Sequence, residues 1–206
     1  MENTIVEQSK VRNRPIKITD IAISKVPRVK LLGLQDSENG FIQNYHKMIL
    51  KEARDLCEEY RRNDMECAMV VSILDMTKGF LIKGSQGKVD FYADEEARVF
   101  IKSARARSLV YMHNHPSTGT FSADDIKTFV YREAFRTMTA VGNDGSVYII
   151  EKTYKADCDR FIADYFKKAR EYKEQGIVNN GTMAINDMLK ISGEYGIVYR
   201  KGGHEK

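Results

Sequence analysis

The residues that could do chemistry are concentrated in one stretch, residues 111–125, which reads YMHNHPSTGTFSADD. Side chains at positions i and i+2 of a β-strand point to the same side, so His113 and His115 can direct two imidazoles at one point. A carboxylate nine or ten residues further on, at the start of a helix packed against that strand, can supply a third metal ligand. Three protein ligands that leave a fourth position open for water are typical of catalytic zinc. The spacing therefore predicts a metal site.

Two adjacent aspartates are candidates for the third ligand, and we prefer Asp125, with Asp124 as the alternative. Ser122 stands three residues before Asp125, where its hydroxyl could polarise a carbonyl or hold an oxyanion. The same S-x-x-D spelling is close to a capping box, in which Ser122 satisfies a backbone amide and Asp125 opposes the positive end of the helix dipole. Capping and ligation can coexist, so both interpretations stay open.

The sequence offers little support for a deaminase, a cysteine-based zinc site or a cysteine nucleophile. A nucleobase deaminase needs H-x-E and P-C-x-x-C, and the sequence has neither. The three cysteines form no C-x-x-C pair, which argues against both a disulfide framework and a thiolate zinc site. Cys67 lies in an apolar run and is expected to be a packing residue rather than a nucleophile.

A strand, a polar loop and a helix must follow one another to position the predicted ligands. Residues 108–112 predict a short strand, and apolar side chains recur at helical spacing after the loop, at Ile126, Phe129, Val130 and Ala134. We expect further helices over about 42–62, from 161 to Gly176 and near 183–191, and strands over 67–75, 80–83, 139–141, 146–150 and 196–199. Residues 77–79 and 142–145 are predicted hairpin turns, while Pro27 reduces the run 21–32 to an edge strand or extended arm. This order indicates an α+β fold with a mixed, curved sheet flanked by helices.

Composition and charge limit the class of protein. The 206 residues are 42% hydrophobic and 30% charged, as in a globular domain, and no apolar run approaches the roughly 20 residues of a membrane helix. The polar N-terminus carries no secretion signal, so we expect a cytoplasmic protein without a membrane partner. Between residues 10 and 30, seven Lys or Arg residues stand against one Asp, but a solvated basic face is a more common explanation than a nucleic-acid site. Nucleic acid is therefore not expected as a partner.

The stretch HNHPSTGTFSADD resembles the H-x-H-P…S-x-x-D signature of the JAB/MPN (JAMM) zinc metalloproteases, in their bacterial and phage form. The resemblance implies one Zn²⁺ per chain held by His113, His115 and Asp125, with Ser122 stabilising the tetrahedral intermediate. In that family a glutamate just after the first helix serves as general acid and base, and Glu66 occupies the corresponding place. The implied activity is hydrolysis of a peptide or isopeptide bond by a metal-activated water.

The resemblance also implies an architecture and partners. It predicts a JAB/MPN-like, cytidine-deaminase-like domain over residues 41–176, between a basic N-terminal extension (1–40) and a C-terminal extension (177–206). The partner would be a protein or peptide, with ubiquitin-like proteins among the candidates. Deubiquitinase members tend to carry a glycine a few residues after the glutamate, whereas Cys67, Ala68 and Met69 follow Glu66. Two alternatives stay open, a non-catalytic binding or assembly module of this fold and a DNA-associated protein like the RadC relatives.

Overall fold

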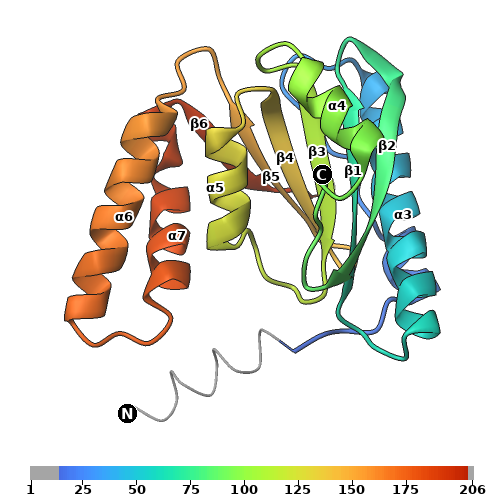
Figure 1. Cartoon of the computed structure of the whole chain (residues 1–206), viewed down its shortest axis with the longest axis horizontal. Coiled ribbons are helices and arrows are strands. Elements are labelled where there is room, and N and C mark those ends of the chain that lie inside the picture. Colours follow the sequence, from blue (N-terminus) through green and yellow to red (C-terminus); the bar gives the residue numbers. More distant parts are fainter. Residues whose placement is uncertain (1–13, 204–206) are drawn as a thin grey trace.

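A single six-stranded sheet with helices on both faces forms the protein (Figure 1). The computed structural model describes residues 14–203; residues 1–13 and 204–206, at the ends of the two predicted extensions, lie outside the described residues. The strands are β1 (Met65–Ser72), β2 (Asp75–Gln86), β3 (Leu109–His115), β4 (Phe135–Gly142), β5 (Val147–Lys152) and β6 (Ile197–Lys201). Their order is β2-β1-β3-β4-β5-β6, and every neighbouring pair is antiparallel except β3 and β4. The predicted α+β class with a mixed sheet is confirmed.

The helices divide between the two faces of the sheet. They are α2 (Asp20–Ser24), α3 (Asp36–Glu59), α4 (Glu95–Ser103), α5 (Ala123–Tyr131), α6 (Cys158–Glu174) and α7 (Asn180–Lys190), with a short 3₁₀ helix, η1 (Ser192–Tyr195). Helix α3 packs its apolar stripe on one face, and α4 to α7 cover the other (Figure 1). Two hydrophobic cores result, one on each side of the sheet.

The parallel pair β3–β4 decides where the predicted ligands lie. Parallel neighbours cannot be joined by a tight turn and need a crossover, which residues 116–134 supply through α5. Loop 116–122 therefore leads from the C-terminal end of β3 directly to the N-terminus of α5. The two halves of the predicted ligand set meet at this end of the sheet.

Several predicted elements differ from the structure. Residues 21–32 form no strand, because Thr19 accepts a hydrogen bond from the Ala22 amide and starts the short helix α2. The first long helix begins at Asp36 rather than near 42, since Gln35 and Glu38 form a capping box there. The first hairpin turns at residues 73–74, so the predicted turn 77–79 lies inside β2. Helix α4 was not predicted from the sequence at all.

The segments predicted as extensions contribute to the two cores. Ile18, Val26, Val29 and Leu31 are buried in the core beneath α3, and α7 buries Ala184, Ile185, Met188 and Leu189 on the other side. Strand β6 pairs with β5 and completes the sheet. The proposed boundary at 40/41 falls within α3, and no helix of the described residues is long and apolar enough to cross a membrane.

Candidate metal centre

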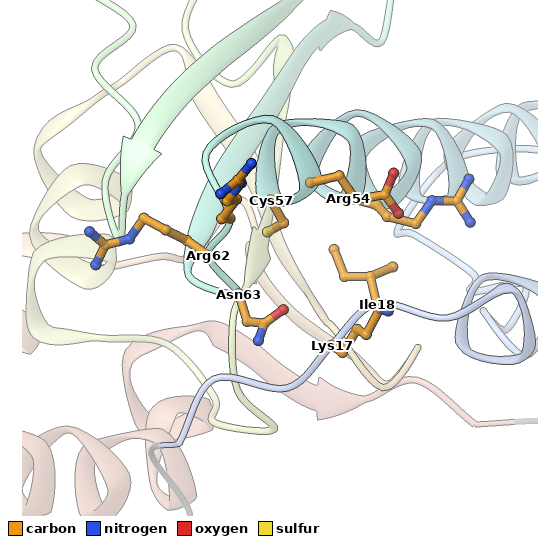
Figure 2. A pocket seen from close by; sticks show the side chains of 8 residues that line it. Lys17, Ile18, Arg54, Cys57, Arg62 and Asn63 are labelled. Carbon is orange, nitrogen blue, oxygen red and sulfur yellow. The ribbon is translucent and has the colours of Figure 1, made fainter.

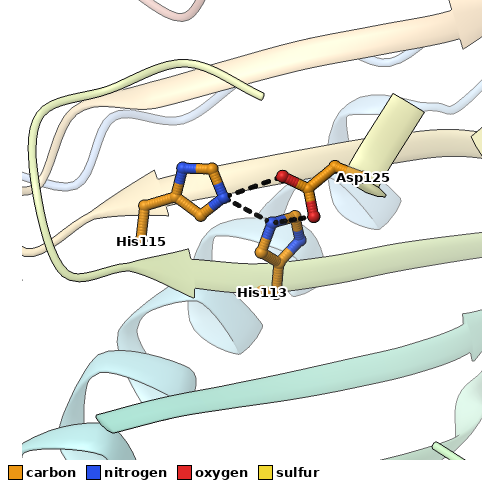
Figure 3. Close-up of side chains that lie close together, drawn as sticks. All are labelled: His113, His115 and Asp125. Carbon is orange, nitrogen blue, oxygen red and sulfur yellow. Dashed lines mark hydrogen bonds and ion pairs between the residues drawn. The ribbon is translucent and has the colours of Figure 1, made fainter. Parts of the chain in front are cut away.

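The end of β3 brings two imidazoles together, as the spacing of two predicts. His113 is almost fully buried and His115 has a side chain that is 12% exposed. Their Nε2 atoms lie 2.9 Å apart, so both rings direct the same nitrogen at one point (Figure 3). Two bare nitrogen lone pairs would repel each other at this distance, which makes the pair suited to sharing a proton or a cation.

Asp125 completes the cluster from the first turn of α5. Its Oδ1 lies 3.3 Å from Nε2 of His113, and its Oδ2 lies 3.1 Å from Nε2 of His115 (Figure 3). Ser122 is the N-cap of α5, and its hydroxyl accepts a hydrogen bond from the Asp125 amide at 3.1 Å. The capping box and the convergence on the histidines are therefore present together.

The three side chains fit the geometry of a metal site. One donor atom from each lies within 4.8 Å of the others. Tetrahedral zinc with bonds of about 2.0–2.2 Å places its ligands roughly 3.3–3.6 Å apart, close to the 2.9, 3.1 and 3.3 Å found between these donors. A His-His-Asp set is a common zinc donor set, and the group could hold a divalent ion.

The electrostatics of the group favour a bound cation. Burial alone would raise the pKa of Asp125, but the two neighbouring histidines hold the pKa of this carboxyl well below its ordinary value. Burial lowers the pKa of His113, so this ring is neutral at pH 7 and can offer a lone pair. The carboxylate of Asp125 outweighs burial at His115 and raises the pKa of that ring.

Glu66 enters the same site from β1. It lines one cleft with His113, His115 and Asp125, and the charges of His115 and Asp125 both act on it. Burial raises the pKa of Glu66 to about 7, with Asp125 adding to the rise and His115 opposing it. A carboxyl that titrates near neutral pH is suited to accept and return a proton.

Two details of the strands shape the backbone around Glu66. The β1–β2 register shifts between Met65 and Cys67, which marks a bulge of the kind found beside functional sites. Opposite it, a Cβ on Gly84 would lie 2.7 Å from the Glu66 carbonyl oxygen and 2.4 Å from that of Lys88. Only glycine allows the chains to approach this closely.

The cleft has a volume of ≈ 1390 Å³ and is walled by segments far apart in the sequence. Its lining includes the three donor residues, the loop 116–122 and, before β3, Gly87, Lys88, Val89 and Phe91. The C-terminal segment supplies Ile177, Val178, Asn179, Thr182, Met183, Asn186, Tyr199 and Lys201. The Tyr199 hydroxyl lies 3.0 Å from that of Thr120, and the Tyr148 hydroxyl donates to the Thr118 carbonyl at 3.3 Å. Neither tyrosine was singled out from the sequence, because Tyr148 and Tyr199 lie on β5 and β6, far along the chain from the loop that they contact.

Asp124, Ser122 and Cys67 are not members of the His-His-Asp group. The side chain of Asp124 is 90% exposed and pairs with Lys127, so Asp125 rather than Asp124 is the carboxylate of the group. The hydroxyl of Ser122 is engaged, since it donates to Asp125 Oδ2 at 2.7 Å. Burial raises the pKa of Cys67 to about 12, which leaves this thiol protonated and unreactive, as expected for a packing residue.

Asn114, between the two histidines, was not singled out from the sequence. It is fully buried, and its side-chain amide bonds to backbone groups of β1. Asparagine is depleted in strands, so its position inside an apolar strand was a signal that could have drawn attention to it.

A second, smaller pocket of ≈ 270 Å³ lies beside the end of α3 (Figure 2). Its lining includes the cationic side chains Lys17, Arg54, Arg61 and Arg62. Two of them are already paired, Arg54 with Asp20 at 2.6 Å and Arg62 with Asp64 at 2.7 Å. It contains none of the predicted site residues.

Comparison of the chain with protein-family models, with curated proteins and with solved structures finds no match.

Proposed function

We propose that this protein is a zinc-dependent peptidase or isopeptidase that resembles the JAB/MPN metalloproteases. The observation that carries the proposal is the convergence of His113, His115 and Asp125 at the end of β3, with Glu66 lining the same cleft. A binding module would need neither a cluster of metal donors nor a carboxyl that titrates near neutral pH beside it. The combination favours hydrolysis.

Each residue then has a separate task. A zinc ion held by the three ligands would supply Lewis acidity, polarising the substrate carbonyl and lowering the pKa of a water. Glu66 accepts the proton of the attacking water and passes it to the leaving amine, which its pKa of about 7 permits in both directions. The Ser122 hydroxyl turns from Asp125 to the oxygen on which negative charge develops. The reaction needs no covalent intermediate with the protein.

The cleft suits a segment of polypeptide. Its volume of ≈ 1390 Å³ exceeds the roughly 300–1,000 Å³ of a small-molecule site. Its lining includes apolar and aromatic residues, among them Phe91, Tyr148, Ile177 and Met183. We therefore propose a peptide or protein substrate, with ubiquitin-like proteins among those to be tested.

The test combines metal analysis with turnover. Protein purified without chelator should contain about one zinc per chain, and a library of unstructured peptides and isopeptide-linked conjugates should be cleaved by the wild type. Glu66→Gln should retain the metal and lose cleavage, because Glu66 is not a ligand. A wild type that binds no zinc, or a Glu66→Gln variant that cleaves as fast as the wild type, would refute the proposal.

A second candidate, a DNA-associated role, draws on the cationic side chains around the smaller pocket (Figure 2). It requires affinity for DNA that falls by about 10³-fold or more between 50 and 200 mM salt, as expected when several phosphates are contacted. An electrophoretic mobility shift at several salt concentrations distinguishes the two. Binding that is absent or independent of salt removes this candidate.

A further inference from the structure

The ladder between β1 and β3 reaches His113 and ends two residues before Glu66 and His115. Its register runs from Ser72 opposite Leu109 to Ala68 opposite His113. Continued by two residues, the same register would set Glu66 directly opposite His115, and directly opposed side chains have Cβ atoms about 4.5–5.5 Å apart. The register therefore ends where the proposed base and a ligand would face each other.

Beyond the end of this ladder, the side chain of Asn114 forms hydrogen bonds with the backbone of β1. Its Oδ1 accepts a hydrogen bond from the Cys67 amide at 2.7 Å, and its Nδ2 donates to the Met65 carbonyl at 3.1 Å. These two backbone groups flank Glu66 on either side. One buried amide thus fixes the backbone of Glu66 from both directions in place of main-chain pairing.

A second asparagine, Asn143, connects this arrangement to the backbone of His115. Asn114 Nδ2 also donates to Oδ1 of the Asn143 side chain at 3.1 Å. The backbone amide of Asn143 in turn donates to the His115 carbonyl at 3.0 Å. Both asparagines are fully buried. The backbone on each side of Glu66 and the backbone of His115 are consequently tied through one continuous set of hydrogen bonds.

We infer that Asn114 is a positioning residue that sets the distance between Glu66 and the metal ligands. The inference rests on the proposed function, since it assigns Glu66 a task that depends on its distance from the ion. Loss of the amide would let the two strands either close into the continued ladder or separate, and displacement of a catalytic group by about 1 Å can cost roughly 100-fold in rate.

The chain offers a matched control in Asn39. This residue is also buried and also links two backbone groups, accepting from the Leu31 amide at 2.9 Å and donating to the Leu34 carbonyl at 3.3 Å. It lies on α3, away from the cleft lining. Asn39→Ala should therefore cost stability as Asn114→Ala does, without affecting the site.

The first measurement needs no substrate. The wild type, Asn114→Ala, Asn39→Ala and Glu66→Gln are loaded with Co²⁺, and the visible absorption of the ion is followed with pH. We expect Asn114→Ala to shift the titration midpoint by about half a pH unit or more, towards that of Glu66→Gln, while Asn39→Ala keeps the wild-type midpoint. If Asn114→Ala has the midpoint of the wild type, the inference is wrong but the proposed function is unaffected. If the wild type binds no Co²⁺, the proposed function on which the inference rests is wrong.

The second measurement uses turnover of a cleaved peptide. Asn114→Ala should lower kcat by about 10- to 100-fold with little change in KM, and should have no further effect when added to Glu66→Gln. Equal loss of kcat in both backgrounds would contradict a role exerted through Glu66. If Asn114→Ala does not fold, Asn114→Asp serves, because it keeps the acceptor for Cys67 and loses the donor to Met65; a wild-type kcat and midpoint in that variant would overturn the inference.

Discussion

Ser122 donates both its backbone amide and its hydroxyl to a single oxygen of Asp125, Oδ2, at 2.7 Å each. The other oxygen, Oδ1, receives nothing from Ser122 and lies 3.3 Å from Nε2 of His113. The capping interaction therefore orients the carboxylate and leaves one of its oxygens for an ion. The side chain of Asp125 therefore belongs both to the capping box of α5 and to the group that could hold a metal ion.

Removing the hydroxyl of Ser122 should affect both uses. We expect Ser122→Ala to lower the free energy of unfolding by about 1 kcal/mol, as for other lost N-caps, and to weaken zinc binding by about tenfold. Urea denaturation and competition with a zinc chelator measure the two effects. Asp157→Ala, which removes the N-cap of α6, is the control for stability alone, and an equal loss of zinc affinity in it would contradict the prediction.

The ligand assignment separates two adjacent aspartates. Asp125→Ala and His113→Ala should weaken zinc binding by more than about 100-fold, because loss of a ligand exceeds the loss of an outer-shell partner. Asp124→Ala should bind zinc as the wild type does, since the side chain of Asp124 is 90% exposed. Zinc content by mass spectrometry is the measurement. Full retention of zinc in both ligand variants would remove the site.

Glu66 should make the stability of the zinc-free protein depend on pH. Its pKa is about 7 in the folded protein against 4.5 ordinarily, so between these values only the folded state holds the proton, and raising the pH lowers the free energy of unfolding. Glu66→Gln has no buried carboxyl to ionise, so its free energy of unfolding should not fall in this way. Above pH 7 the variant should be more stable than the wild type by about 1–3 kcal/mol, and the difference should vanish near pH 4.

Urea denaturation of metal-free protein at several pH values measures this difference. The exposed Glu96 provides the control Glu96→Gln, which tests the loss of a carboxylate at the surface. A Glu66→Gln variant whose stability parallels that of the wild type at every pH would show that Glu66 does not carry the effect.

The close approach at Gly84 should be sensitive to a single methyl group. A Cβ there would lie 2.4 Å from the Lys88 carbonyl oxygen and 2.7 Å from that of Glu66, so Gly84→Ala should lower the free energy of unfolding by about 1–3 kcal/mol and reduce turnover. Gly193→Ala is the control, because nothing lies within 4 Å of its added carbon. A Gly84→Ala variant as stable and active as the wild type would show that the strands can move apart freely.

The sequence was informative wherever the relevant contacts are local. The spacing of two between His113 and His115 and the spacing of three between Ser122 and Asp125 each lie within one element or one loop, so strand and helix periodicity were enough to align them. The interpretation of S-x-x-D as a capping box is confirmed. Periodicity could not choose between Asp124 and Asp125, which required the direction of the first helical turn.

Strand and helix periodicity cannot predict contacts between residues that are far apart in the sequence. The position of Glu66 relative to His115 depends on the register of β1 against β3, and the sequence offered it only through a family resemblance. The tyrosine that contacts Thr120 lies 79 residues away, in a segment that looked like an extension. Pro27 favours an extended arm over residues 21–32, whereas Thr19 followed by Asp20 is a helix-start signal, and the structure has the short helix α2 there.

The hydroxyl pair of Thr120 and Tyr199 has a consequence for synthesis on the ribosome. A nascent chain that has emerged only as far as α5 already carries both imidazoles and the carboxylate, yet it lacks β6 and one wall of the cleft. The loop 116–122 can form its hydrogen bond between Thr120 and Tyr199 only after translation has passed Tyr199. The order of the elements along the chain thus delays a complete cleft until translation has passed β6.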